Sequence, residues 1–216
     1  MRTDELITLL GASFEREPAR SSRLTRRIGF AAALGAVSAL CLVLLALGVR
    51  PDLTEGRALA FFVVKVIFAA TVGGVALWYL GKLARPGGER KVHLGVAALP
   101  FAVIILLAAL SLASAPPAHW HGMVTGEMWL ECLLSIPVIA VVPFVTLMWV
   151  VRRIGAPTDL VRTGAMVGLA AGAVSALGYA LHCMDDTIPF IALWHGGTIA
   201  LCTLAGALLG PRLLRW

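Results

Sequence analysis

The segment Leu181–His195, LHCMDDTIPFIALWH, separates two long apolar runs near the C-terminus. It places a histidine, a cysteine and two aspartates within residues 182–186. A second cysteine, Cys132 in the segment WLECLLSIP, also stands at the start of an apolar run. This shared position predicts that Cys132 and Cys183 lie at the same face of a membrane protein.

The composition places the chain in the lipid bilayer. Of the 216 residues, 59% are hydrophobic and 14% are charged, and the sequence contains neither Asn nor Gln. A soluble domain carries about 25% charged residues. Several apolar runs reach the roughly 20 residues that cross a bilayer as a helix. The net charge of +6 is therefore interpreted through its distribution among loops, and direct nucleic-acid binding is not expected.

The apolar runs predict an all-α membrane protein, a bundle of six transmembrane helices. We expect one compact domain over residues 28–216, preceded by a cytoplasmic N-terminal segment, residues 1–27. The polar start of the chain lacks a signal-peptide pattern, so the first span is expected to be retained. The six predicted spans are Ile28–Val49, Ala58–Gly81, Val92–Leu112, Met128–Val151, Val161–Leu181 and Ile188–Gly210.

The distribution of Lys and Arg predicts the orientation. Fifteen lie in the N-terminal segment, the second and fourth loops and the C-terminal end, whereas the first, third and fifth loops hold only Arg50 and Arg57. Cytoplasmic loops of membrane proteins are enriched in Lys and Arg. We therefore expect both termini in the cytoplasm of a multi-pass inner-membrane protein, with Cys132 and Cys183 toward the opposite side.

The segment Thr3–Phe14 has the pattern of a short amphipathic helix, followed by a basic linker that contains Pro18. Acidic residues in its first turn suit the positive end of a helix dipole. Two interpretations remain open: a helix that lies on the lipid surface, and a helix that docks into a groove of a partner protein. The residues that would form the contact are Asp4, Glu5, Leu6, Ile7, Leu9, Leu10 and Phe14.

The four cysteines fall into two pairs. Cys41 and Cys202 lie inside spans and are interpreted as packing residues. Cys132 and Cys183 lie at the ends of consecutive antiparallel helices, where two thiols could form a disulfide, bind a soft metal or react with an oxidant. They could also be apolar fillers, and sequence alone does not show whether a disulfide is geometrically possible.

Several polar residues could support these thiols. Protonated His182 would favour the Cys183 thiolate, and Asp185 and Asp186 would oppose it, so the net effect on the thiol pKa stays open. A metal site could draw on these side chains, with His119, His121 and His195 nearby, but no spacing typical of a metal motif supports one, so neither a metal nor a cofactor is expected.

Lys65 is the one charge well inside a predicted span. It either extends toward the interface or pairs with an acid, because an unpaired charge in a span is costly. We hypothesise a pair between Lys65 and Glu131.

Small-residue steps mark the fifth and sixth spans. Gly164, Gly168 and Gly172 form two GxxxG steps on one, and Gly206 and Gly210 form another. Such steps allow helix backbones to approach closely. They are interpreted as packing within the chain, with a homodimer seam as the alternative.

Several motifs together resemble the NrsF family of bacterial inner-membrane negative regulators of extracytoplasmic-function sigma factors. They are MRTDELITLL at residues 1–10, KLARPGG at 82–88, ECLLSIP at 131–137, CMDDTIPFIALWH at 183–195 and GALLGPRLLRW at 206–216. The resemblance implies an anti-sigma factor whose cytoplasmic N-terminus holds the sigma factor. It also implies that Cys132 and Cys183 sense heavy metals or oxidants, and it assigns no role to Cys41 or Cys202.

Two other classes of function compete with this interpretation. One is a small membrane enzyme or transporter that uses His182, Cys183 and Asp185. The other is a structural membrane subunit whose cysteines only pack. No nucleophile–base set, phosphate-binding loop or paired catalytic carboxylate occurs in the sequence, so an enzyme is not expected.

Overall fold

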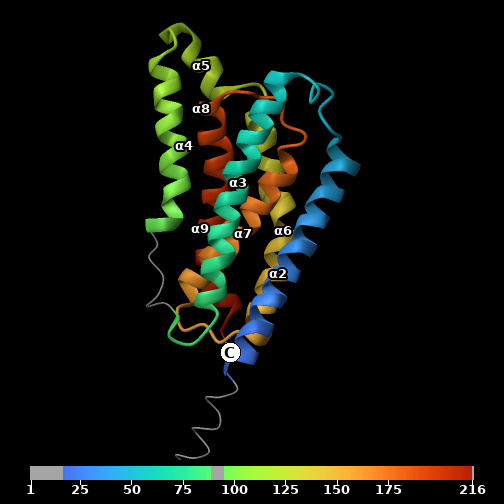
Figure 1. The fold of residues 1–216 in the computed structure, drawn as a ribbon, viewed down its shortest axis with the longest axis vertical. Coiled ribbons are helices and arrows are strands. Elements are labelled where there is room, and N and C mark those ends of the chain that lie inside the picture. The colour runs from blue at the N-terminus through green and yellow to red at the C-terminus, as the bar shows by residue number, and fades with distance from the viewer. Residues whose placement is uncertain (1–16, 89–94, 216) are drawn as a thin grey trace, which may run out of the picture.

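The computed structural model describes residues 17–88 and 95–215 of the chain (Figure 1). These residues form helices and connecting turns, and no strand occurs among them, which confirms the all-α prediction. The elements are α2 (Glu17–Leu42), the π-helical turn η1 (Val43–Leu47), α3 (Gly56–Leu83), α4 (Gly95–Ala113), α5 (Pro117–Thr125), α6 (Trp129–Ile154), α7 (Leu160–Tyr179), α8 (Ile188–Phe190), the π-helical turn η3 (Ile191–His195) and α9 (Gly196–Leu213).

Six helical segments of the described chain are long and apolar enough to cross a membrane, as predicted. They are Arg23–Leu47, Gly56–Leu83, Gly95–Ala113, Pro117–Ile154, Leu160–Tyr179 and Ile188–Leu213. The fourth begins earlier than expected because the short helix α5 precedes α6 across a turn at Gly126. The fifth ends earlier because the chain turns after Tyr179, where His182 N donates to Tyr179 O.

The N-terminal part of α2 differs from the sequence prediction. Residues 17–27 were expected to belong to a linker, but α2 starts at Glu17 and continues into the first span. Pro18 does not prevent this, because proline is tolerated in the first turn of a helix, where its missing N–H has no helical partner. The predicted amphipathic helix Thr3–Phe14 lies outside the described residues.

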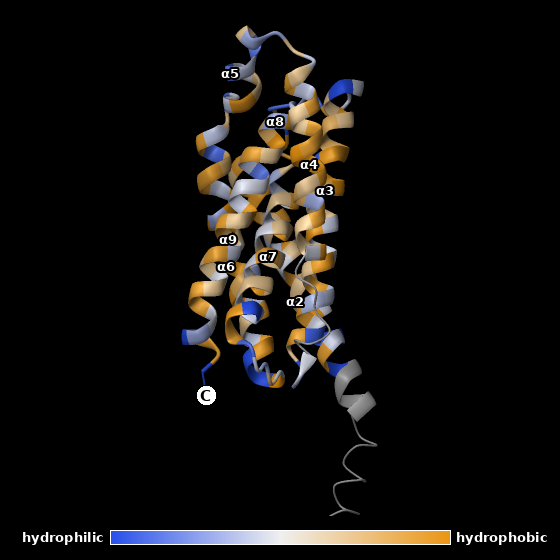
Figure 2. Ribbon diagram, turned by 90° about the vertical axis from the view of Figure 1, so that its left-hand side faces the viewer, coloured by the Kyte–Doolittle hydropathy of each residue, from blue (hydrophilic) through white to orange (hydrophobic). Residues whose placement is uncertain are grey.

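Helix α7 occupies the centre of the bundle (Figures 1 and 2). In its apolar window 72% of the residues are buried, against 22–44% in the other five spans. Its sequence is rich in Gly and Ala, and small side chains let neighbouring backbones approach closely. Helix α7 packs against α2, α3, α6 and α9, so every main helix except α4 is positioned by it.

The glycine steps form the contact between α7 and α9. A Cβ atom at Gly164 would overlap the carbonyl oxygen of Gly206, and one at Gly168 would overlap that of Cys202. A Cβ atom at Gly206 would in turn overlap the carbonyl oxygen of Gly164. The prediction of packing within the chain is confirmed, and because these glycines face each other, the structure gives no support to a homodimer seam built on them.

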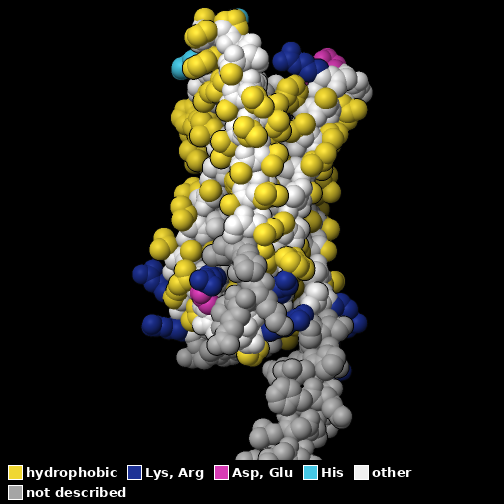
Figure 3. Space-filling model, turned by 60° about the vertical axis from the view of Figure 1, so that its left-hand side comes forward, with side chains coloured by type: hydrophobic (Ala, Val, Ile, Leu, Met, Phe, Trp, Pro, Cys, Tyr) yellow, Lys and Arg dark blue, Asp and Glu magenta, His cyan; other side chains and the backbone are white. Residues whose placement is uncertain are grey.

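Charge separates the two ends of the bundle. The basic end carries the start of α2, the ends of α3 and α6, the start of α7 and the C-terminus, and it gathers most of the described cations (Figure 3). These cations are Arg23, Arg26, Arg27, Lys82, Arg85, Arg152, Arg153, Arg162, Arg212 and Arg215. The opposite end, here called the cysteine end, holds Cys132 and Cys183. Between the ends, exposed hydrophobic side chains cover the surface, as expected for contact with lipid (Figure 3).

Candidate functional site

The loop between α7 and α8, residues 180–187, carries Cys183 at the cysteine end. Its start is fixed by two turns, because both His182 N and Cys183 N donate to Tyr179 O. The Cys183 side chain is completely buried. Burial raises the pKa of the Cys183 thiol, although the ammonium group of Lys65 acts in the opposite direction. Burial thus opposes formation of the thiolate at this position.

Two buried cations hold the backbone of this loop. Lys65 Nζ donates to Cys183 O at 2.8 Å and contacts Asp186 Oδ1 at 3.2 Å. Arg50 donates from one terminal nitrogen to Cys183 O at 2.9 Å and from the other to Asp186 Oδ2 at 2.6 Å. Both cationic side chains have no exposed surface. The carbonyl group of Cys183 is therefore held from α3 and from the loop that precedes it.

The hypothesised pair between Lys65 and Glu131 is wrong. Lys65 reaches from α3 to the loop between α7 and α8 and meets Asp186 there, whereas the Glu131 carboxylate lies 3.6 Å from His182 Nε2 and is 60% exposed. A buried ammonium group needs a partner that is shielded from water too. Asp186, with 13% of its side chain exposed, meets that need and Glu131 does not.

Arg50 is the residue of this candidate site that sequence reasoning missed. Its guanidinium group also binds both carboxylate oxygens of Asp52, at 2.6 and 2.7 Å. Asp52 and Asp186 hold the pKa of Arg50 above its ordinary value, and Arg50 lowers the pKa of Asp52. We call Arg50, Asp52, Lys65 and Asp186 the charge cluster; it contains two cations and two anions. The sequence feature that could have pointed to Arg50 is the Arg50–Pro51–Asp52 tripeptide, which lies in a loop otherwise poor in cations.

Asp185 connects the loop to the start of α6. Its carboxylate accepts hydrogen bonds from Glu127 N and Met128 N, at 2.8–3.2 Å. Such an acid at a helix N-terminus satisfies free N–H groups and suits the helix dipole. Gly126 adopts φ +60°, and a Cβ atom there would lie 2.6 Å from Asp185 Oδ2. Glycine is thus required at this turn on both conformational and steric grounds.

His182 lies at the edge of the site rather than beside the aspartates. Helix α7 ends at Tyr179, so His182 and Asp186 do not face each other across a helical turn. Instead, the His182 ring donates from Nδ1 to Gly48 O at 3.1 Å, and Nε2 approaches Glu131. His182 therefore connects the C-terminal end of the first span to α6.

Cys132 lies in the first turns of α6 and is completely buried. Its Sγ is 3.7 Å from Nδ1 of His195, the last residue of η3. Met184 N donates to Met128 Sδ at 3.4 Å, and Cys132 N donates to Met128 O. The residue after Cys183 thus contacts the residue one turn before Cys132, so the structure brings both thiols to one cluster. Both cysteines are free.

The other candidate ligands lie apart from this cluster. His119 and His121 are exposed on α5. Within residues 17–88 and 95–215, no three His, Cys, Asp or Glu side chains are grouped closely enough to hold a metal ion. The predicted partner-binding residues Asp4, Glu5, Leu6, Ile7, Leu9, Leu10 and Phe14 fall outside the described residues.

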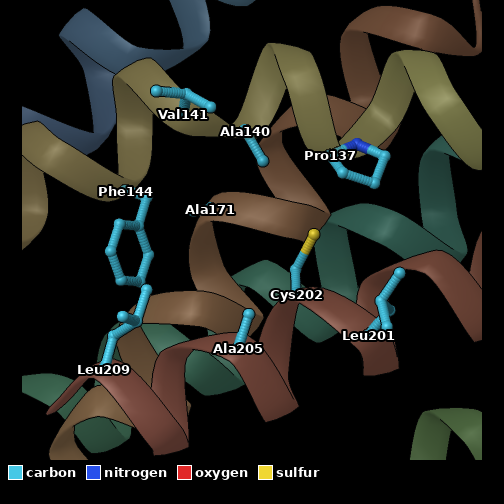
Figure 4. Close-up of a pocket in the computed structure, with 9 residues that line it drawn as sticks. All are labelled: Pro137, Ala140, Val141, Phe144, Ala171, Leu201, Cys202, Ala205 and Leu209. Atoms are coloured by element: carbon cyan, nitrogen blue, oxygen red, sulfur yellow. The ribbon is translucent and has the colours of Figure 1, made fainter.

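An apolar groove of about 380 Å³ runs between α6 and α9 (Figure 4). It is lined by Pro137, Ala140, Val141, Phe144, Ala171, Leu201, Cys202, Ala205 and Leu209. Cys202 is 9% exposed and is the one lining residue with a titratable side chain, so no acid–base partner accompanies it among them. The prediction that Cys202 is a packing residue agrees with this position. Cys41, by contrast, is exposed on α2.

Fold and site together define a class: a helical membrane protein with a cluster of thiols and charges at one end and basic residues at the other. The model of the family "NrsF: Negative regulator of sigma F" matches residues 13–216. The chain is 34% identical over 218 residues to "Probable anti-sigma-F factor NrsF" of Azospira oryzae, and 33% identical over 219 residues to "Anti-sigma-F factor NrsF" of Caulobacter vibrioides. Each match covers 100% of both chains.

The chain therefore belongs to the NrsF family, as the sequence motifs predicted. The family is described as a negative regulator of sigma F, and both relatives carry the name of an anti-sigma factor, so a regulatory role as an anti-sigma factor is what the comparisons support. No solved structure is significantly similar to the chain.

Proposed function

We propose that the protein is an inner-membrane anti-sigma factor that holds an extracytoplasmic-function sigma factor at its cytoplasmic N-terminus. It releases this partner when heavy metals or oxidants modify Cys132 and Cys183 on the periplasmic side. The observation that carries the proposal is the contact of Arg50 and Lys65 with the carbonyl of Cys183. Modification of the Cys183 thiol would displace the backbone carbonyl that Arg50 and Lys65 otherwise hold in place.

The proposed orientation follows from the two ends of the bundle. The basic end would face the cytoplasm, because Lys and Arg are enriched on that side of membrane proteins. Both termini would then be cytoplasmic, and the cysteine end would face the oxidising compartment in which thiol chemistry is most frequent. A signal would travel along the helices from the thiols to the tail.

The N-terminal helix is the proposed contact with the sigma factor. Its apolar residues Leu6, Leu10 and Phe14 recur every four positions, the spacing of a helix face that docks into a groove. Asp4 and Glu5 would add charge contacts. A synthetic peptide of residues 1–20 immobilised on a resin should retain the sigma factor, and a peptide with Leu6 and Leu10 changed to Asp should not.

Signal transfer requires two arrangements of similar free energy, with the sigma-binding one preferred at rest. Cys132 lies in the first turns of α6, Cys183 lies in the loop that follows α7, and the two helices pack directly against each other. Joining or derivatising the thiols would change how these helices meet, and α2, which contacts both, leads to the tail.

The decisive experiment is reporter transcription from the sigma-dependent promoter in cells with Cys132→Ser, Cys183→Ser or both. We expect the double variant to keep the promoter silent and to lose induction by cadmium and by peroxide. Cys41→Ser is the matched control, because that cysteine lies on a different helix and is exposed. Undiminished induction in the double variant would refute the sensing role.

A further inference from the structure

A second apolar groove, of about 260 Å³, lies between α2 and α6. Two of its lining side chains are large and exposed: Phe30 of α2 is 73% exposed and Trp149 of α6 is 56% exposed. The hydroxyl group of Thr146, which also lines the groove, donates to the carbonyl oxygens of Val142 and Pro143 on its own helix. The groove therefore offers an occupant an almost wholly apolar surface.

A close contact between the two helices ends the groove on the side away from the basic end. A Cβ atom added at Gly35 of α2 would lie 2.6 Å from Pro143 Cβ of α6, so no larger side chain fits between the helices there. Leu34 and Val145, which line the groove, lie next to this contact. An occupant must therefore enter from the surrounding lipid or from the basic end.

On the side of the basic end, arginines continue both stripes of lining residues. Arg23 and Arg27 are four residues apart on α2, and lining residues follow at positions 30, 31 and 34. On α6, Val145, Trp149 and Arg153 follow one another at steps of four. Residues three or four apart lie on the same face of a helix. Arg27 and Arg153 therefore both lie about one helical turn from the groove, toward the basic end.

These arginine side chains are accessible to an anion. Arg23, Arg27 and Arg153 are exposed, and none of them forms an ion pair with an acid whose side chain the structure describes. The guanidinium carbon of Arg153 lies 5.9 Å from the centre of the Trp149 ring, so this side chain lies over a residue that lines the groove. Positive charge from two helices thus gathers beside one end of an apolar groove.

An anionic phospholipid has the matching chemistry. Guanidinium groups bind phosphate oxygens through paired hydrogen bonds, and an acyl chain suits an apolar groove. Basic pockets between transmembrane helices bind anionic lipid headgroups in other membrane proteins. A helix of a partner protein, about 10–12 Å across with its side chains, is too wide to enter a groove of about 260 Å³, whereas a hydrocarbon chain is much narrower.

We propose that the groove between α2 and α6 binds an anionic phospholipid from the membrane leaflet at the basic end. One acyl chain lies in the groove, the phosphate group contacts Arg27 and Arg153, and Arg23 adds a third positive charge nearby. The bound lipid joins α6 to α2, the helix that leads to the N-terminal segment. This inference goes beyond the proposed function and does not involve the cysteines.

The test uses the purified full chain in nanodiscs of phosphatidylcholine, with a varied fraction of lipid that carries brominated acyl chains. Bromine quenches tryptophan fluorescence on contact, and the difference between the unaltered chain and Trp149→Phe isolates the signal of Trp149. Half-maximal quenching of Trp149 should need a roughly tenfold lower mole fraction of brominated phosphatidylglycerol than of brominated phosphatidylcholine, since each arginine beside an anionic lipid contributes roughly fivefold. Equal quenching by the two lipids would indicate ordinary lipid contact and overturn the proposal without any arginine variant.

Substitutions then locate the headgroup. Arg27→Gln combined with Arg153→Gln should abolish the preference, so that both brominated lipids quench Trp149 at similar mole fractions. Arg26→Gln combined with Arg152→Gln is the matched control, because it removes the same charge from the same two helices. Arg26 and Arg152 are also exposed, but each is turned by about 100° around its helix from the neighbouring groove arginine. An equal loss in both double variants would indicate a general attraction of the basic end for anionic lipid and refute the groove site.

The outcomes separate this inference from the proposed function. If the Arg27→Gln and Arg153→Gln chain keeps its lipid preference but no longer retains the sigma factor in detergent, these arginines bind the protein partner, and the lipid site is refuted. If that chain loses the lipid preference while the control keeps it, the lipid site stands. A reporter response that survives Cys132→Ser with Cys183→Ser would remove the sensing role and leave this result unchanged.

Discussion

At the scale of single residues, Asp186 is the centre of the site, since it accepts from two buried cations at once. Arg50 reaches one carboxylate oxygen at 2.6 Å, and both Arg50 and Lys65 reach the other. The two cations come from the first loop and from α3, which are distant in sequence from the aspartate. One side chain thus binds three segments of the chain together.

Replacing Asp186 should therefore destabilise the bundle more than replacing either cation. Asp186→Ala leaves two buried cations with one carboxylate, and removing one partner of a buried ion pair costs roughly 3–5 kcal/mol. Lys65→Met leaves the pair of Arg50 with Asp186 intact and should cost less. The measurement is the thermal unfolding midpoint in detergent.

The control for this series is Arg57→Met, which removes an exposed cation in the first turn of α3. Exposed charges contribute little to stability, so its midpoint should match that of the unaltered chain. An Asp186→Ala midpoint as high as that of Arg57→Met would contradict the central role of Asp186.

The residue scale also shows where sequence reasoning reaches its limit. The sequence placed Cys132, Cys183, His182, Asp185, Asp186, Glu131 and Lys65 at one end of the bundle, and the structure brings them together there. It did not reveal which acid Lys65 meets, because depth in a span says nothing about the direction a side chain takes around the helix. Arg50 was missed for a related reason: a loop residue gives no periodic signal when it folds inward.

At the scale of the elements, the packing of α7 against α9 depends on glycine. Gly168→Ala places a Cβ atom against the carbonyl oxygen of Cys202, so the helices must separate. We expect a lower thermal midpoint and weaker retention of the sigma factor, measured by unfolding and by co-purification.

Gly74→Ala on α3 is the matched substitution, because no atom lies within 4 Å of the added Cβ. Alanine favours a helix over glycine by up to about 1 kcal/mol, so this variant should be unchanged or slightly more stable. Equal effects of the two substitutions would mean that the α7–α9 contact does not limit stability.

The helices themselves were largely predictable, since a run of about 20 apolar residues has few other structures available in lipid. Their irregular ends were not. The break at Gly126 is fixed by the Asp185 carboxylate from a distant loop, and the π-helical turn that aims His195 at Cys132 depends on tertiary packing. Neither is encoded in the local pattern.

At the scale of the whole molecule, the proposed orientation can be tested on exposed positions of a chain without native cysteines. Ser114→Cys lies next to α4 at the cysteine end, and Ala156→Cys lies after α6 at the basic end; both positions are exposed. In intact spheroplasts, a membrane-impermeant maleimide should label the first variant and spare the second. The reverse labelling would invert the orientation and with it the direction of signalling.

The shared carboxylate of Asp186 has one more consequence. In a medium of low dielectric constant, two positive and two negative groups can be buried together at low cost only while all four contact one another. If one group moves away, a remaining group is left buried with an uncompensated charge, which costs free energy. Partial separation of the charge cluster is therefore disfavoured, and the cysteine end should change conformation in a single cooperative step. If each molecule responds in this all-or-none way, the level of transcription in a cell would follow the fraction of molecules that have switched.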